Sequence, residues 1–328
     1  MRIGFIIGRV GGVDGVALEA EKWVTVLRRM GHQTFVLSGD IEGRPANPDE
    51  DDILLPLSFY GNECNWEQKQ AYFGGLASTD ELLDGIQRSA QVISDGIIEW
   101  VRRRKLDLVI VENAGALPFH ISMGLGVRVA LEQLAMPAIT HDHDFAWERG
   151  DRYLSSREEL NALVGENFPL RLPNVHHAVI NTPARESLAT RFGIEASVVP
   201  NVMDFNQPYG QRTDYNATLP ADMGLNVDDI PLFQVTRIIE RKGIDTAVRL
   251  LNKLDDQRIK LVITGAPTDD PGGRYMRQLK DLIASLHLQS RVRFGFRVVA
   301  REAGITAGGS KLYGLSDAYA HARACTFF

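Results

Sequence analysis

The chain has 328 residues, of which 44% are hydrophobic and 24% are charged, and its formal net charge is −6. This length and composition are typical of a globular protein with two domains, each with its own hydrophobic core. The negative net charge excludes bulk attraction to nucleic acid or to an anionic membrane surface, so a site for a phosphate group must be local.

The first 37 residues predict a β-α-β unit. Residues 3–7 have the pattern of a short buried strand, a glycine-rich turn follows, and a helical stretch then runs to Met30. Residues 34–37 have the pattern of a second strand. Such a unit is typical of a doubly wound parallel sheet, and therefore of an α/β fold.

The glycine-rich turn leaves its role open. Its glycines are spaced G-x-x-G-G-x-x-G from Gly8 to Gly15, whereas dinucleotide-binding proteins have G-x-G-x-x-G. Asp40 lies near the position of a ribose-binding acid, so a nicotinamide-dependent enzyme remains a poorly matched alternative. The glycines allow a ligand to approach the backbone closely, and a tight turn with positive φ explains them equally well.

Strands and helices continue to alternate along the chain. Helices are expected at 78–104, 121–134, 183–192, 244–254, 275–286 and 312–322, and strands at 107–111, 179–181, 196–199, 231–236, 259–264 and 291–296. The periodicity is lost in a stretch rich in Asn, Asp, Gly and Pro, which favours a domain boundary. We therefore expect a first domain over 1–205, a linker over 206–230 and a second domain over 231–328.

A polar cluster lies in the first half of the chain, at the ends of two predicted strands. Asn113 follows one strand, and alternating His and Asp residues occupy 141–144. On a strand His141 and His143 would share one face and the aspartates the other. A metal site needs further ligands that the sequence does not identify, so no metal is predicted. A substrate or catalytic role and a structural network both remain open.

A second polar stretch, Thr236 to Gly243, lies between a predicted strand and a predicted helix. Arg237 leaves the strand, and Lys242 stands at the helix start, where backbone N–H groups and the helix dipole favour an anion. Two cations at such a turn suit a diphosphate. The alternative is a solvated basic turn.

The compartment is predicted from the cysteines and from hydropathy. Cys64 and Cys325 are the only cysteines, and they have neither the spacing of a disulfide framework nor that of a zinc site. No run of residues approaches the roughly 20 apolar residues of a transmembrane helix. A cytoplasmic protein without a transmembrane segment is expected.

Taken together, these motifs resemble the family 4 retaining glycosyltransferases of the GT-B fold. The resemblance rests on the glycine turn, on the His-Asp cluster and on Arg237 followed by Lys242-Gly243. It also rests on Val199 to Asp204, which is similar to the strand that leads into that family's second domain, and on Ser316 to Ala322. The resemblance covers essentially the whole chain and implies two Rossmann-like domains that face a cleft.

The resemblance implies a hexose donor activated by a nucleotide diphosphate, either UDP or GDP, and a carbohydrate or small-molecule acceptor. Arg237 and Lys242 would bind the diphosphate and stabilise the leaving group as its charge develops. Gly12 and Gly15 would lie near the donor phosphates. No cofactor is implied besides this co-substrate.

The resemblance also implies roles in the first half of the chain. His143 would lie beside the transferred sugar as a catalytic residue. Asn113, Asp144 and Arg149 would contact the acceptor or the sugar.

The chain also departs from the family pattern. It ends before the E-x7-E motif, whose carboxylates contact the donor, so the second domain is expected to be incomplete and the chain to have little or no activity. Loss of one transition-state contact lowers a rate by about 10²–10³. The alternative function is a non-catalytic binding protein, in which a sheet edge near Phe327 and Phe328 would promote self-association.

Overall fold

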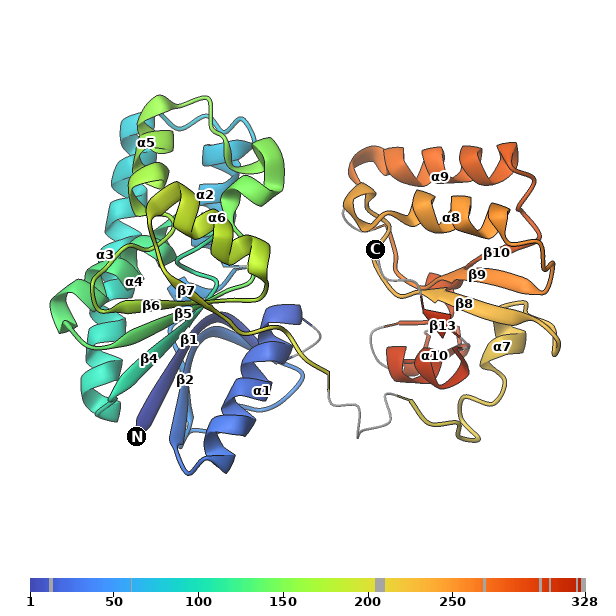
Figure 1. Ribbon diagram of the computed structural model, residues 1–328, viewed down its shortest axis with the longest axis horizontal. Helices are drawn as coiled ribbons and strands as arrows, with labels where there is room; N and C mark the ends of the chain where they lie inside the picture. Colours follow the sequence, from blue (N-terminus) through green and yellow to red (C-terminus); the bar gives the residue numbers. More distant parts are fainter. Residues whose placement is uncertain are drawn as a thin grey trace. The chain divides into compact units, whose positions relative to one another are not determined.

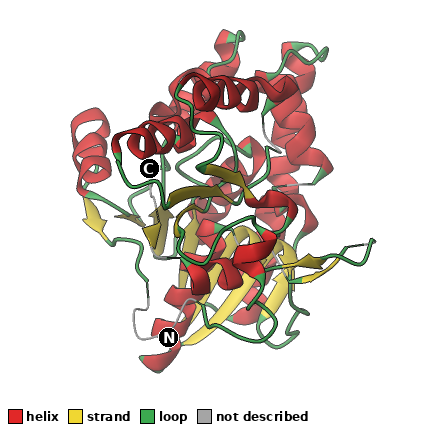
Figure 2. Cartoon of the chain, turned by 90° about the vertical axis from the view of Figure 1, so that its right-hand side faces the viewer, coloured by secondary structure: helices red, strands yellow, loops and turns green. Residues whose placement is uncertain are grey.

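The computed structural model of the chain describes residues 1–11, 14–59, 61–203, 210–267, 270–300, 303–306, 308–322 and 324–325. The chain divides into two compact units, which we call unit 1 (1–203) and unit 2 (204–328) (Figure 1). The chain contains both helices and strands (Figure 2), and they largely alternate in the sequence. The α/β class predicted from the sequence is confirmed.

Unit 1 is built on a sheet of seven strands in the order β3-β2-β1-β4-β5-β6-β7. Every neighbouring pair in this sheet is parallel. The strands are β1 (Arg2–Gly11), β2 (Gln33–Glu42), β3 (Asp51–Ile53), β4 (Leu108–Glu112), β5 (Ala138–Asp142), β6 (Val175–Val179) and β7 (Ala196–Val198). The helices are α1 (Gly15–Arg29), α2 (Asn62–Tyr72), α3 (Thr79–Arg104), α4 (Ile121–Leu134), α5 (Glu158–Asn167) and α6 (Thr182–Phe192), with 3-10 helices η1 (Leu55–Leu57) and η2 (Ala146–Tyr153).

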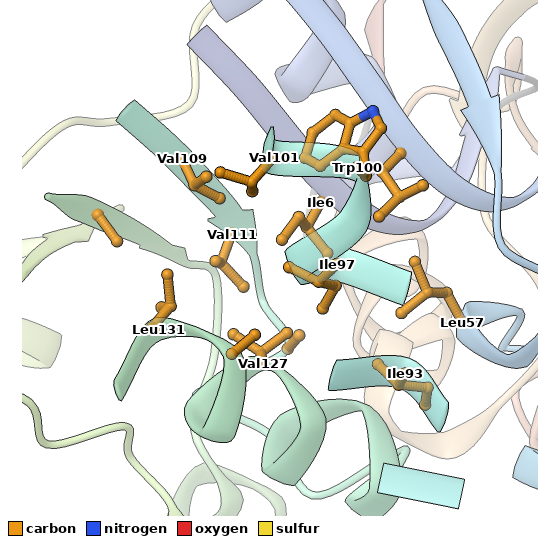
Figure 3. Packing of buried hydrophobic residues seen from close by; sticks show 14 of the residues in the cluster. Ile6, Leu57, Ile93, Ile97, Trp100, Val101, Val109, Val111, Val127 and Leu131 are labelled. Atoms are coloured by element: carbon orange, nitrogen blue, oxygen red, sulfur yellow. The ribbon is translucent and has the colours of Figure 1, made fainter. Parts of the chain in front are cut away.

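The central strands of unit 1 are apolar on both faces because helices cover both. Phe5 and Ile7 on β1 pack with residues of α1, while Ile6 between them packs with residues of α3 and α4. Figure 3 shows Ile6 among the side chains of this second core layer, which includes Val111. An unbroken apolar run is the pattern expected of a buried parallel strand.

Unit 2 contains a second parallel sheet in the order β10-β9-β8-β13. Leu261 and Ile263 on β9 pack with α8 and α9, and Val262 packs on the opposite face with α7 and α10 (Figure 1). The strands are β8 (Ile230–Gln234), β9 (Ile259–Ile263), β10 (Val292–Phe294) and β13 (Ala324–Cys325), with an antiparallel pair β11 (Gly304–Ile305) and β12 (Lys311–Leu312). The helices are α7 (Leu219–Asp222), α8 (Ile244–Lys253), α9 (Arg274–Ser285) and α10 (Leu315–His321), with 3-10 helices η3 (Glu240–Lys242), η4 (Pro271–Gly273) and η5 (Gly295–Arg297).

The first two strands are longer than their apolar runs predicted. β1 and β2 continue to pair beyond residue 7, with Arg9 opposite Asp40 and Gly11 opposite Glu42. Arg9 Nε donates to Asp40 Oδ1 at 2.7 Å. This extension includes polar pairs as well as the apolar pair of Val10 and Ile41, and hydrophobic periodicity does not detect the polar pairs.

The linker predicted over 206–230 is corrected for residues 210–230. Leu219, Met223 and Leu225 are buried and pack against Phe233 and Tyr313. The packing involves one short helical turn and isolated apolar residues, which have no detectable period. Residues 210–230 therefore belong to unit 2.

None of the helices in the described part of the chain is long and apolar enough to cross a membrane. Phe327 and Phe328, at which a self-associating sheet edge was predicted, lie outside the described residues, and so does Gly12.

Candidate functional site

The polar residues of unit 1 gather where the strand order of the sheet reverses. β1 lies between β2 and β4, and the chain after β1 enters α1 on one face, whereas the chain after β4 enters α4 on the other. Ligands of open α/β sheets bind at the carboxyl ends of strands at such a switch point. Asn113 directly follows β4, and His143 directly follows β5.

Asn113 joins the predicted site residues to one another. Its Oδ1 accepts a hydrogen bond from the backbone N–H of His143 at 3.1 Å, and its Nδ2 donates to Asp144 Oδ1 at 3.0 Å. Asp144 also forms an ion pair with Arg149. Asn113 has a φ of +58°, a left-handed conformation that asparagine tolerates better than most residues. In addition to Gly12 and Gly15, the sequence predicted four site residues in unit 1, namely Asn113, His143, Asp144 and Arg149. The structure brings these four residues together.

The alternation predicted for the His-Asp cluster is also present. The rings of His141 and His143 lie on one side, with their centroids 4.3 Å apart. Asp142 lies on the other side, where its Oδ2 is 2.8 Å from Nδ1 of His177. Burial acts to lower the pKa of His177, but the hydrogen bond and the charge of Asp142 raise it above its ordinary value. Asp142 and His177 therefore form a structural pair in the interior.

Glu112 completes the side on which the two histidines lie. Its Oε2 is 2.9 Å from Nδ1 of His141 and 3.5 Å from Nε2 of His143. Glu112 and His141 are fully buried, and the side chain of His143 is 9% exposed. Within the described ranges, Glu112, His141 and His143 are the group able to hold a metal ion, with one ligand atom from each within 4.8 Å of the others.

Two further residues border this group. The indole of Trp23 on α1 lies 4.4 Å from the ring of His141, measured between centroids. Nδ2 of Asn201, in the segment after β7, is 3.5 Å from Nδ1 of His143. This segment is held close to α1, because the N–H of Val202 donates to Glu19 at 3.4 Å. His143 is thus contacted by residues at the end of β4, by His141 on β5 and by Asn201 after β7.

The start of α1 differs from the phosphate-binding turn expected there. The carboxylate of Asp14 caps the helix and accepts from the N–H groups of Val16 and Ala17 at 3.0 and 3.2 Å. These donors are therefore already occupied by an anion of the chain itself. Gly15 is exposed, and nothing lies within 4 Å of the position where a Cβ would stand.

The predicted cation stretch of unit 2 lies between β8 and α8, as expected. Arg237 is exposed, whereas Ile238 is fully buried and its N–H donates to Ala266 O at 3.2 Å. A Cβ at Gly265 would lie 2.1 Å from the carbonyl oxygen of Thr236, so only glycine permits this close approach of the two strand ends. The backbone that carries Arg237 is therefore firmly positioned.

Lys242 ends a 3-10 turn immediately before α8. Its carbonyl accepts from Gln234 Nε2 at 3.4 Å, and Gly243 is the N-cap residue of α8 with a φ of +59°. The N–H of Asp245 donates to the hydroxyl of Tyr275 at 3.2 Å. The N–H groups of Asp245 and Thr246 at the helix start are thus bound within the chain, which leaves fewer N–H donors for the anion site predicted there.

Sequence reasoning missed three members of the unit 1 cluster: Glu112, Trp23 and Asn201. Glu112 is adjacent to Asn113 at a strand end, so its position was a usable signal. Trp23 gave none, and Asn201 was noted only as part of the segment Val199 to Asp204, because each meets a histidine more than 50 residues away in the sequence.

Comparison with known families decides the class of unit 2. The family model described as "Glycosyl transferases group 1" matches residues 217–320. The chain carries a glycosyl transferases group 1 domain. Arg237, Lys242 and Gly243 all lie inside this domain.

Two proteins similar to this chain are mannosylglucosylglycerate synthases. The protein of Petrotoga mobilis is 30% identical over 248 residues, which cover 76% of this chain and 56% of the relative. The protein of Thermotoga maritima is 32% identical over 261 residues, which cover 78% of this chain and 57% of the relative. The chain thus spans somewhat more than half the length of these relatives.

Solved structures of other proteins share the fold. A glycosyltransferase of Rickettsia africae superposes with a TM-score of 0.57 at 12% identity, covering 99% of this chain and 72% of that protein. Sucrose-phosphate synthase of Thermosynechococcus elongatus gives 0.55 at 14% identity, with 99% and 74% covered. Anabaena HepE in complex with UDP-glucose gives 0.53 at 14% identity, with 90% and 68% covered. The predicted GT-B fold and the resemblance to its glycosyltransferases are confirmed.

Proposed function

We propose that this chain takes part in the transfer of a hexose from a nucleotide diphosphate sugar to an acceptor, with retention at the anomeric carbon. The observation that carries the proposal is the position of Arg237 and Lys242 around the start of α8, within a glycosyl transferases group 1 domain. Fixed cations at a strand-to-helix turn suit the diphosphate of a donor such as UDP-glucose, which is bound by HepE.

The same proposal assigns the unit 1 cluster to the sugar and the acceptor. His143 is the residue proposed to face the transferred hexose, and Asn113 holds its backbone in place. Asp144 and Arg149 supply an acceptor and a donor of hydrogen bonds to hydroxyl or carboxylate groups.

The relatives' names suggest the substrates. Mannosylglucosylglycerate contains two hexoses and one carboxylate, so a mannosyl donor and a glucosylglycerate acceptor are the pair that we propose to test first. The reaction is followed by mass spectrometry of the product, and the anomeric configuration by NMR coupling constants. GDP-mannose supplies the mannosyl group in this test, and UDP-glucose is the alternative donor.

Donor binding is tested separately from transfer. Arg237→Ala removes one charge-assisted contact worth about 1.5–3 kcal/mol, so we expect UDP or GDP to bind roughly 10- to 100-fold more weakly in calorimetric titration. Lys253→Ala, an exposed cation at the other end of α8, is the matched control and should bind as the unaltered chain does.

The outcomes separate the candidate functions. Binding without product formation would favour the non-catalytic binding protein over the transferase. No binding of either nucleotide at millimolar concentration, or equal binding by the Arg237→Ala variant, would contradict the donor site.

A further inference from the structure

Arg152, in η2, is a cation whose charge is not compensated by an acidic side chain of the described residues. Its Nη2 donates instead to a neutral group, Oε1 of Gln68, at 3.0 Å. Its Nη1 is buried and has no hydrogen-bond partner in the described part of the chain. A guanidinium is always charged and has five N–H donors, so leaving them unused is costly unless a ligand accepts from them.

Aromatic rings hold the guanidinium of Arg152 in place. Its Cζ lies 4.5 Å from the ring centroid of Phe73 and 5.2 Å from that of Tyr153. Rings that pack on the face of a guanidinium leave its N–H edge for hydrogen bonds. Phe73 is 61% exposed and Arg152 is half-buried, so this group lies at a surface that a ligand can reach.

The backbone that follows Arg152 is tied to the end of α2. The hydroxyl of Ser155 donates to the carbonyl of Ala71 at 2.7 Å. Arg157 donates to two carbonyls, those of Gln70 and Ala77. Arg152 therefore stands on a positioned segment, which a preformed binding site requires.

Arg152 lies at the same edge of the sheet as His143. The loop between β4 and α4 begins at Asn113, whose side chain binds the N–H of His143. Near the other end of this loop, the carbonyl of Phe119 accepts from Nε2 of Gln68, the residue that binds Arg152. One loop thus contacts both the residue proposed to face the sugar and the partner of Arg152, which favours a role for Arg152 towards the acceptor.

We propose that Arg152 binds a carboxylate of the acceptor and thereby selects an acidic acceptor over a neutral one. The planar fork of an arginine matches the two oxygens of a carboxylate. Arg149 is paired with Asp144, whereas Arg152 has no such partner among the described residues. This inference rests on the proposed function, in which the acceptor is glucosylglycerate.

The test compares glucosylglycerate with glucosylglycerol, which lacks the carboxylate. Calorimetric titration of the full chain without donor should show that glucosylglycerate binds at least about tenfold more tightly, because a charge-assisted hydrogen bond is lost with the neutral compound. Equal binding of the two compounds, or no binding of glucosylglycerate at millimolar concentration, would overturn the proposal.

Variants locate the preference. Arg152→Ala should bind the two compounds equally, through a loss of affinity for glucosylglycerate alone. Arg152→Gln removes the charge but keeps an N–H donor for Gln68, so it should do the same and decides if the alanine variant does not fold. A loss of the same factor for both compounds would show that Arg152 is structural, and the proposal would be wrong.

Arg191→Ala is the matched control. Arg191 also packs on an aromatic ring, with Cζ 5.1 Å from the centroid of Trp147, and Nε donates to Ser187 Oγ at 3.1 Å. This variant should keep the preference for glucosylglycerate. Loss of the preference in Arg191→Ala as well would count against Arg152 as the carboxylate ligand.

Competition identifies the anion. D-glycerate should displace glucosylglycerate from the unaltered chain more effectively than inorganic phosphate does. The reverse order would assign Arg152 to a phosphorylated ligand and overturn the carboxylate.

These measurements need neither donor nor sugar transfer. Transfer to glucosylglycerate that is unaffected in both Arg152 variants would overturn this inference alone and leave the proposed function standing. Failure of nucleotide binding would contradict the donor site and leave the carboxylate site standing.

Discussion

At the scale of single residues, Asn113 is the position on which the unit 1 site depends most. Its side chain is bonded to the backbone of His143 and to the carboxylate of Asp144, and its own backbone is left-handed. Aspartate would lose the N–H donor, and most other residues would be strained at this φ. The chemistry of the strand end therefore requires one particular side chain.

We predict that Asn113→Ala lowers the free energy of unfolding by about 2–4 kcal/mol. Two hydrogen bonds are each worth about 1 kcal/mol, and the left-handed conformation costs an alanine roughly 1–2 kcal/mol. Asn113→Gly loses the same bonds without the conformational cost, so it should be about 1 kcal/mol more stable than the alanine variant. Urea unfolding of both variants measures the difference, and equal stabilities would contradict the role of φ.

At the scale of elements, α4 begins without a cap of its own and is capped by a neighbouring helix. Its N-cap residue, His120, makes no side-chain cap bond. Glu67 of α2 instead accepts from the N–H of Ser122 at 3.2 Å and from its hydroxyl. Burial raises the pKa of Glu67 to about 7, and burial lowers the pKa of His120 to about 4. The two side chains are 3.8 Å apart.

The two shifts have opposite effects on stability. The pKa of Glu67 is above its ordinary 4.5, so its contribution is lost as the pH rises towards 7. The pKa of His120 is below its ordinary 6.5, so its contribution is lost as the pH falls towards 4. Between pH 4.5 and 6.5 the changes of these two contributions with pH have opposite signs and nearly cancel in the unaltered chain.

Removing His120 should expose the effect of Glu67. Relative to the unaltered chain, His120→Gln should gain about 2 kcal/mol in its free energy of unfolding when the pH falls from about 6.5 to about 5, since each pKa unit is worth about 1.4 kcal/mol. Urea unfolding at the two pH values provides the measurement, with His176→Gln as the exposed control. A difference from the unaltered chain that does not vary with pH would refute the burial argument for His120.

At the scale of the whole molecule, the chain consists of two units with separate cores. The cores of unit 2 contain Ile263 and Phe233, and the described members of each core come from one unit alone. Arg237 and Lys242 lie in unit 2, whereas the His143 cluster lies in unit 1. A nucleotide bound by the cations should therefore stabilise one unit.

We predict two thermal unfolding transitions, of which UDP or GDP raises one. At a nucleotide concentration of 100 Kd the bound unit gains about 2.7 kcal/mol, or roughly 10 °C in its midpoint. Ile263→Ala, which empties a fully buried site in unit 2, should lower the same transition by calorimetry. A nucleotide that moved the other transition would place the donor site in unit 1.

Much of the fold was predictable because its signals are local. The helices at 79–104, 121–134 and 244–253 were found within a few residues from apolar periodicity. Asn113 and Arg237 were predicted as site residues because polar residues follow apolar runs there, and their roles stay predictions. The family resemblance came from motifs read in order along the chain.

The α/β class, the two halves and the polar residues at the strand ends could be predicted from the sequence, since each depends on neighbours within about one element. Tertiary packing placed Glu112 beside His141, the hydroxyl of Tyr275 at the start of α8, and Glu67 at the start of α4. These contacts join residues about 30 or more positions apart. Such pairings follow from how the sheet and helices pack, and no local pattern records them.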